Sequence, residues 1–462
     1  MIKSHVVMGG NWSESARIVP ERATCNAASV TKRSGTEHAG QFRYRSKRHQ
    51  DLPHIVKFSG GRSSAMLLFN LLEDGLLQAH RGDVIIFNNT SCEHPATYRF
   101  VSRCKRRVER DYGIPFFLVE FQTHEDARRG EWTRIQSYRL VNDRPVSSTN
   151  PDGFHWKGEV FEELLSHDAY VPNQFRRTCT ATLKLEASRL FLQDWFAGKE
   201  GIPRLGHTGS GSRVDLDVLY KRHESNRGGV PRELYLQKKR YVLSRPPSRP
   251  SQKYGDFSAA TTPFSNASLD GKVFGNTAWF GTDGVEYVTF IGIRGDEQRR
   301  VARVAANVHA KARSDGEHVY MPFAERNVTK ADVSDYWRRR DWDLKLPTDG
   351  SLSNCVFCFL KGVQNLDVVY RRMGIGAMDD GAGFGPIDDT PCDLKWWVRM
   401  EQTYGRDLVA ENRPRTGDGD VDFVGFFGAS SGFSYDTLAT SGVTGDDLSQ
   451  YTDSVLPCDC TD

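Results

Sequence analysis

A short apolar strand that runs into a glycine turn and then a helix constrains this chain more than any other feature. Residues 55–58 predict a buried strand, and residues 64–72 have the apolar spacing of an amphipathic helix. The turn between them reads Ser59, Gly60, Gly61, Arg62, Ser63, Ser64. Two glycines let the backbone approach an anion, the first N–H groups of the helix point toward it, and the hydroxyls and guanidinium add donors. The segment therefore predicts a phosphate-binding turn, although a purely structural tight turn would look the same. The spacing of a Walker loop is absent.

Further strands and helices alternate along the chain. We expect strands at residues 83–87, 116–121 and 287–292. Helices are expected at 95–112, where proline opens the first turn, and at 182–196. Another helix begins after Thr329, which serves as N-cap with Asp332 at the third position. This order predicts an α/β fold with a doubly wound parallel sheet.

Composition and charge divide the chain into three regions. Residues 1–50 carry nine Lys and Arg against three Glu, and we expect a basic, disordered leader. Residues 51–375 form the predicted domain, interrupted by an irregular insertion rich in Gly, Ser and Pro at about 206–284. Residues 376–462 carry five Lys and Arg against seventeen Asp and Glu, and we expect them to be poorly ordered. The middle region keeps a net charge of +9, which suits a polyanionic partner as well as an ordinary solvated surface.

Location follows from what the sequence lacks. No run of about 18 apolar residues is present, so no membrane span is expected. The N-terminus does not have the basic and apolar regions of a secretory signal. Nine cysteines, an odd number scattered over 462 residues, do not resemble a disulfide framework. We therefore expect a cytoplasmic protein without a membrane partner.

The segment 58–65 resembles the pyrophosphate-binding loop of the PP-loop ATP pyrophosphatase superfamily, in its phosphoadenosine phosphosulfate (PAPS) reductase-like family. Later segments are similar to that family in the same order. They are Phe87–Thr90 with Glu93, His94 and Thr97; Gly292–Arg294 with Asp296, Glu297 and Arg300; and Tyr320–Phe323 with Thr329–Asp332 and Trp337. The resemblance spans residues 54–373, apart from the insertion.

This resemblance implies an adenine nucleotide alpha hydrolase-like, Rossmann-type sheet that binds ATP, PAPS or adenylyl sulfate. The nucleotide-contacting residues it implies are Ser59, Gly60, Gly61, Arg62, Ser63, Ser64, Asn89, Thr90, Gly292 and Arg294. Catalytic roles would fall to Arg62, Ser63 and Cys179. The superfamily usually has aspartate where this chain has Ser63, and that departure bears on nucleotide hydrolysis more than on binding.

Cys355 and Cys358 form a Cys-x-x-Cys pair that can place two thiolates on one metal or cluster. In the family that the chain resembles, a cysteine at the position of Cys179 joins such a pair at a [4Fe–4S] cluster. Three cysteine ligands would leave one iron open for exogenous sulfide. Zinc, with His94 or Cys392 as a fourth ligand, is the alternative metal, and a redox pair or two packed thiols remain open.

Three functions are compatible with these residues. The first is an enzyme that adenylylates an acceptor and transfers sulfur to it, with a sulfur donor protein as partner and nucleic acid as one acceptor that suits the basic middle region. The second is a sulfonucleotide reductase acting on PAPS or adenylyl sulfate. The third is a catalytically degenerate nucleotide-binding module. The basic runs 105–107 and 338–340 fall on expected helices, where a solvated face is the ordinary interpretation and a nucleic-acid groove the alternative.

Overall fold

The computed structural model divides the chain into two units, Met1–Gln41 and Phe42–Asp462. The residues that the structure describes all lie in the second unit. They are 42–126, 133–196, 231–234, 286–314, 316–373, 384, 386–412, 422–428 and 433–441. Of the expected insertion, only residues 231–234 are among them. None of the helices in these ranges combines the length and apolar character needed to cross a bilayer.

A seven-stranded sheet in the order β5-β4-β3-β2-β1-β6-β7 forms the centre of this unit. Its strands are β1 (His54–Lys57), β2 (Val84–Asn89), β3 (Phe116–Asp126), β4 (Thr133–Pro145), β5 (Gly153–Phe154), β6 (Tyr287–Ile291) and β7 (Glu317–Tyr320). Four neighbouring pairs are parallel: β3 with β2, β2 with β1, β1 with β6, and β6 with β7. The expected α/β fold with a mostly parallel sheet is therefore confirmed.

The sheet is mixed at one side, which the sequence analysis did not anticipate. β4 runs antiparallel to β3 and is paired with it from Leu118–Val141 to Asp126–Thr133. β3 also extends five residues past its expected end at Phe121. β3 begins with the buried apolar run at residues 116–119, whereas its extension past Phe121 is polar and is paired with β4. The extension therefore depends on pairing with β4 and not on an apolar run.

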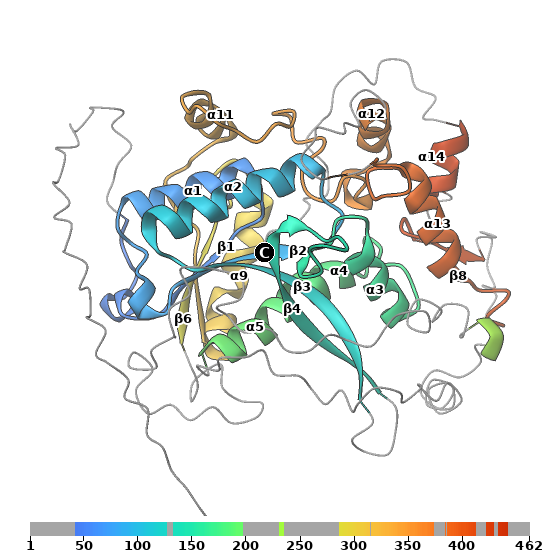
Figure 1. Cartoon of the computed structure of the whole chain (residues 1–462), viewed down its shortest axis with the longest axis horizontal. Helices are drawn as coiled ribbons and strands as arrows, with labels where there is room; N and C mark the ends of the chain where they lie inside the picture. The colour runs from blue at the N-terminus through green and yellow to red at the C-terminus, as the bar shows by residue number, and fades with distance from the viewer. Residues whose placement is uncertain are drawn as a thin grey trace, which may run out of the picture. The chain divides into compact units, whose positions relative to one another are not determined.

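Helices cover the two faces of the sheet (Figure 1). On one side lie α1 (Arg62–Glu73) and α2 (Pro95–Tyr112), and on the other α5 (Ala187–Phe196) and α9 (Gln298–Ser314). α2 has the expected bounds because Pro95 occupies its first turn and Gly113, with φ of 66°, ends it in the left-handed region. α11 (Lys330–Arg338) packs against α1 and begins at the expected capping box of Thr329 and Asp332.

The expected helix at 182–196 begins earlier and is irregular. A short turn α4 (Thr178–Thr180) leads into the π-helical turn η3 (Ala181–Glu186) and then into α5. Phe191 and Trp195 of α5 pack on Phe117 of β3. α3 (Glu159–Asp168) precedes this region, and a two-residue strand pair, β8 (Arg406–Asp407) with β9 (Phe423–Val424), lies near the C-terminus.

Both expected limits of the domain are corrected. Phe42 contacts the rings of Phe290 and Tyr320, so residues from 42 onward belong to the folded unit, whereas 51 was expected. Beyond 376, the described residues include α13 (Leu394–Tyr404) and α14 (Tyr435–Ser441), which follow α12 (Val363–Met373). Trp396 and Trp397 of α13 are buried against Phe161 of α3. The described residues of this part are folded because their aromatic side chains, despite the acidic composition around them, join the main core.

Candidate functional site

The glycine turn lies where β1 ends and α1 begins, as expected. Gly60 has φ of 78°, and a Cβ at this position would lie 2.9 Å from Thr97 Cγ2 on α2. Only glycine therefore fits here without strain. The Ser59 hydroxyl donates to Ser64 Oγ over 2.9 Å, and Ser64 Oγ donates to the Gly61 carbonyl over 3.0 Å. These bonds hold the turn in one shape.

The N-terminus of α1 is open to an anion. Gly61 is its N-cap and has no side chain to cap the first turn. The N–H groups of a helix's first turn have no acceptor within the helix, and the helix dipole adds positive potential there. A phosphate would satisfy both conditions.

A cavity of about 660 Å³ opens in front of this turn. One wall is residues 59–64, another is residues 292–300 after β6, and α11 and residues 344–354 close it. Gly292 allows the close approach of two walls, because its Cβ would lie 3.1 Å from Ser64 Cα. The structure thus brings together the glycine turn and Gly292 with Arg294, as expected. The loop 344–354 has no periodic pattern, and sequence reasoning missed it.

The lining of this cavity favours an anion. It includes six basic residues and three acidic ones. The basic residues are Lys57, Arg62, Arg294, Arg299, Arg300 and Lys330, and the acidic ones are Asp296, Glu297 and Asp349. Ser63 Oγ accepts from Arg294 Nη1 over 3.3 Å, which links the turn to the segment after β6. Because Lys57 pairs with Glu317 and Arg62 pairs with Asp343, both carboxylates lying outside the lining, the site keeps only a small excess of positive charge beside the helix N–H groups.

Arg62 forms contacts that the sequence analysis did not anticipate. Its guanidinium forms a two-pronged ion pair with Asp343, with Nε to Oδ1 and Nη2 to Oδ2 both at 2.8 Å. It also donates to the carbonyls of Leu344 and Leu346. The side chain is 13% exposed. Arg62 therefore lines the cavity and also anchors the loop that closes it, a positioning role that the sequence did not indicate, while its expected contact with a nucleotide stays a prediction.

Asn89 and Thr90 do not line the cavity. Asn89 is fully buried, and its amide donates to Glu120 Oε1 and to the His155 carbonyl, both over 2.7 Å. Thr90 donates to Glu93 over 2.7 Å. Their polar atoms are used inside the protein, so they support the sheet edge and do not contact a ligand in the cavity.

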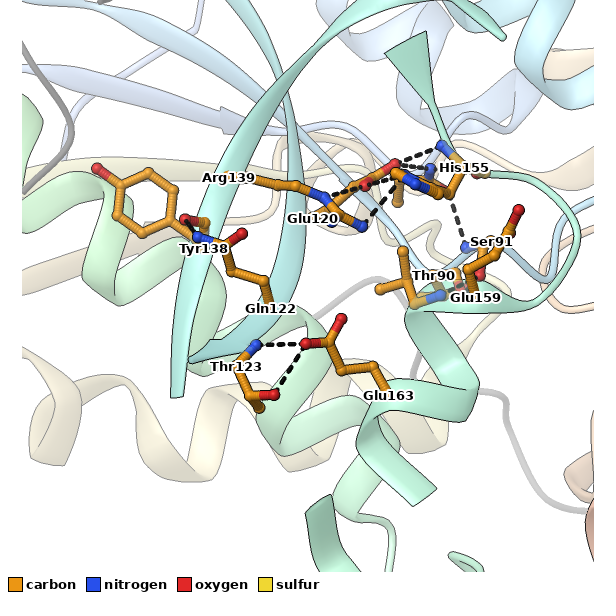
Figure 2. Close-up of polar contacts among 12 residues, drawn as sticks. Thr90, Ser91, Glu120, Gln122, Thr123, Tyr138, Arg139, His155, Glu159 and Glu163 are labelled. Atoms are coloured by element: carbon orange, nitrogen blue, oxygen red, sulfur yellow. Dashed lines mark hydrogen bonds and ion pairs between the residues drawn. The ribbon is translucent and has the colours of Figure 1, made fainter. Parts of the chain in front are cut away.

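Glu120 is the centre of a buried polar cluster in the middle of β3 (Figure 2). Its carboxylate accepts from Arg139 Nε over 2.7 Å and from the His155 backbone N–H over 2.7 Å, and it lies 2.8 Å from His155 Nδ1. Burial alone would raise the pKa of Glu120, but the charges of His155 and Arg139 and these hydrogen bonds together lower it to about 2. Glu120 is therefore ionised throughout the physiological range. Sequence reasoning did not single out this cluster.

The expected thiols do not line the cavity, although Cys355 directly follows its lining residues Ser353 and Asn354 in the chain. Cys355 and Cys358 are buried, and Cys358 N donates to the Cys355 carbonyl over 3.2 Å. Cys355 forms an isolated bridge with Glu93, and its sulfur lies 3.5 Å from Thr90 Oγ1. Burial raises the pKa of the neighbouring Cys92 thiol, and its hydrogen bond with Cys355 opposes this. Burial therefore favours the neutral form of the Cys92 thiol.

Cys179 is partly exposed in α4, directly before the π-helical turn η3. Across the described ranges, no three His, Cys, Asp or Glu side chains converge in an arrangement that could hold a metal ion. Cys179, Cys355 and Cys358 do not form such a group, and the iron–sulfur site and the alternative zinc site stay predictions.

Comparisons with known proteins add little functional information. The chain is 21% identical, over 318 residues, to the nin region protein ORF290 of Escherichia phage lambda, a protein that is itself uncharacterized. The alignment covers 69% of each chain. No family model matches the sequence, and no solved structure matches it.

Proposed function

We propose that this protein binds an adenine nucleotide, ATP or a sulfonucleotide such as PAPS, in the cavity between residues 59–64 and 292–300. The observation that carries the proposal is the position of this cavity. In the sheet, β2 to β5 lie on one side of β1, and β6 and β7 lie on its other side. The carboxyl ends of β1 and β6 thus meet at a switch point of the sheet, where ligands of open α/β sheets bind.

The chemistry of the walls supports a nucleotide in particular. The glycine turn and the N-terminus of α1 suit a phosphate group. The basic side chains of the lining suit a negatively charged ligand. The volume of about 660 Å³ lies within the range of sites for ligands larger than a single phosphate.

The reaction we propose is the one implied by the PP-loop resemblance. An acceptor is adenylylated at the α-phosphate of ATP, and pyrophosphate leaves. In the next step a sulfide-level sulfur from the donor attacks the activated atom of the acceptor and forms the new bond to sulfur, and the bond to AMP breaks so that AMP leaves. Incubation with ATP and product analysis tests this: AMP and pyrophosphate support it, whereas ADP and phosphate contradict it. A sulfonucleotide reductase would instead be indicated by stronger binding of PAPS or adenylyl sulfate than of ATP.

Substitutions at Gly61 test the binding site itself. Gly61→Asp adds a helix cap, which maintains or raises the melting temperature, but places a carboxylate where the phosphate would bind. Thermal-shift titration with ATP should then show no stabilisation. Gly61→Ala is the matched control, because its Cβ would lie 3.6 Å from Ser59 Oγ, an ordinary contact, and the N–H groups stay open. Equal stabilisation of Gly61→Asp and wild type by ATP would exclude this site.

A further inference from the structure

One face of α2 carries a row of arginines that the proposed nucleotide site does not use. They stand at intervals of four, three, one and three residues, which places them along one side of the helix. The row is Arg99, Arg103, Arg106, Arg107 and Arg110. The opposite side of α2 is buried and apolar, with Phe100, Val101, Cys104 and Val108 in the core. The arginine row is therefore not needed to attach α2 to the sheet.

These arginines line a groove. It has a volume of about 620 Å³ and is completed by the end of β4, where Arg144 adds a sixth guanidinium. Asp143 is the one acidic residue in its lining. None of its lining residues belongs to the cavity in front of the glycine turn. The two sites are therefore separate.

Neighbouring carboxylates neutralise only part of this charge. Arg106 pairs with Asp143 over 3.0 Å, and Arg110 pairs with Asp111 over 2.6 Å. Glu109 is occupied by Lys105, which is buried. In the part of the chain that the structure describes, Arg103, Arg107 and Arg144 form no ion pair with a carboxylate. Like charges four residues apart on a helix are destabilising, so an anion in the groove would relieve that cost.

Two of the guanidinium groups are held in place by an aromatic ring. Arg103 and Arg107 each lie 4.9 Å from the centroid of Trp342, which is buried. A guanidinium stacked on an aromatic face is restricted in orientation and keeps its in-plane N–H groups for hydrogen bonding. A guanidinium held in this way presents two parallel N–H donors, which match two oxygens of a phosphate diester.

We propose that this groove binds the phosphodiester backbone of a nucleic acid. From Arg99 to Arg110 the helix rises about 16 Å, and phosphates along one strand of a duplex are spaced about 3.4 Å along its axis. The row therefore matches a repeating anion better than a single phosphate. A membrane surface fits less well, because the apolar side of α2 is buried in the core and is not available to insert into lipid.

The experiment measures binding of the full chain to labelled 30-mers by fluorescence anisotropy. Duplex DNA, single-stranded DNA and RNA are separate arms, which distinguishes the sources of the same phosphodiester chemistry. Arg103→Gln/Arg107→Gln should raise Kd at least tenfold. It should also lower the slope of log K against log salt for duplex DNA by about 1.8, since each phosphate contact contributes about 0.9.

The matched control removes two exposed arginines elsewhere, in Arg189→Gln/Arg399→Gln. Arg189 lies on α5, on the other face of the sheet from α2, and Arg399 lies on α13. This variant has the same net charge and should bind nucleic acid like wild type. Equal losses in both double variants would overturn the proposal, because they would show a general charge effect.

A second double variant tests the groove without changing the side chains that pack on Trp342, whose loss could unfold the protein. Arg106→Gln/Arg110→Gln changes side chains that are each 69% exposed and do not contact Trp342. It should also weaken binding and should melt like wild type. Failure of wild type to bind any of the three nucleic acids, or tighter binding to anionic vesicles or polyglutamate at equal salt, would exclude the proposal. Stabilisation of these variants by ATP should equal that of wild type. The test of the groove is therefore independent of the test of the proposed nucleotide site.

Discussion

At the residue scale, Glu120 links a buried ion pair to the pH dependence of stability. Its folded-state pKa of about 2 lies below the ordinary value of 4.5. The group therefore contributes stability above about pH 4.5, and this contribution is lost as the pH falls toward 2. Glu120→Gln should reduce the free energy of unfolding by about 3 kcal/mol at pH 7 and by progressively less below pH 4.5. Urea denaturation at pH 7, 4 and 3 measures this.

A surface pair provides the comparison for that prediction. Glu186 pairs with Arg189 on the exposed side of the helix, where its side chain is 31% exposed. Glu186→Gln should change stability by less than about 1 kcal/mol, with little pH dependence. A loss at Glu120→Gln that is equally small, or independent of pH, would contradict the role of Glu120.

The positions of individual side chains could be predicted where the local backbone determines them. They could not be predicted where the contact partner is distant in sequence. The glycine turn and Gly292 with Arg294 meet at one cavity, as their order in the chain predicted. Arg62 lines that cavity as expected, but Asp343, 281 residues away, forms an ion pair with its guanidinium. A sequence shows that a side chain is polar, but it does not show whether a distant residue already supplies its hydrogen-bond or ion-pair partner.

At the scale of the element, α11 depends on its N-terminal cap. The Thr329 side chain accepts from Asp332 N, and Asp332 reaches back to Thr329 N over 2.8 Å. Thr329→Ala removes one side of this capping box and should cost about 1 kcal/mol. Chemical denaturation measures the cost. Thr329→Ser retains the hydroxyl and should be close to wild type, and equal destabilisation by both changes would contradict a capping role.

Elements with local start and stop signals were predictable. α2 is bounded by Pro95 and Gly113, and its expected ends are confirmed. β4 has no comparable signal, because its conformation depends on antiparallel pairing with β3. The π-helical turn η3 likewise reflects packing of α4 and α5 around it, and no composition rule marks it.

At the scale of the whole molecule, the folded unit is longer at both ends than composition indicated. A chain trimmed to 51–375 lacks Phe42 and Tyr44 and also Trp396 and Trp397. We expect it to melt at least ten degrees below the full chain or to aggregate, because Phe161 and the rings near Tyr320 would lose their cover. A chain of residues 42–462 should melt like the full chain. Differential scanning fluorimetry compares the three.

The acidic composition after residue 376 explains why that region was misjudged. Composition averages over a segment, whereas a few large aromatic side chains can fix it to the core. Phe426 and Tyr435 pack with Trp397 although acidic residues surround them in sequence.

The pairing of β1 with β6 has a consequence for biosynthesis. Ile55 pairs with Thr289, and Lys57 pairs with Ile291, so the two central strands are separated by more than 230 residues of chain. At ordinary translation rates of 5–20 residues per second, one edge of β1 waits about 12 to 45 seconds for its neighbour to leave the ribosome. An unpaired edge in the middle of a future sheet is a template for wrong partners during that interval. Newly made chains of this protein should therefore depend on chaperones more than finished ones do.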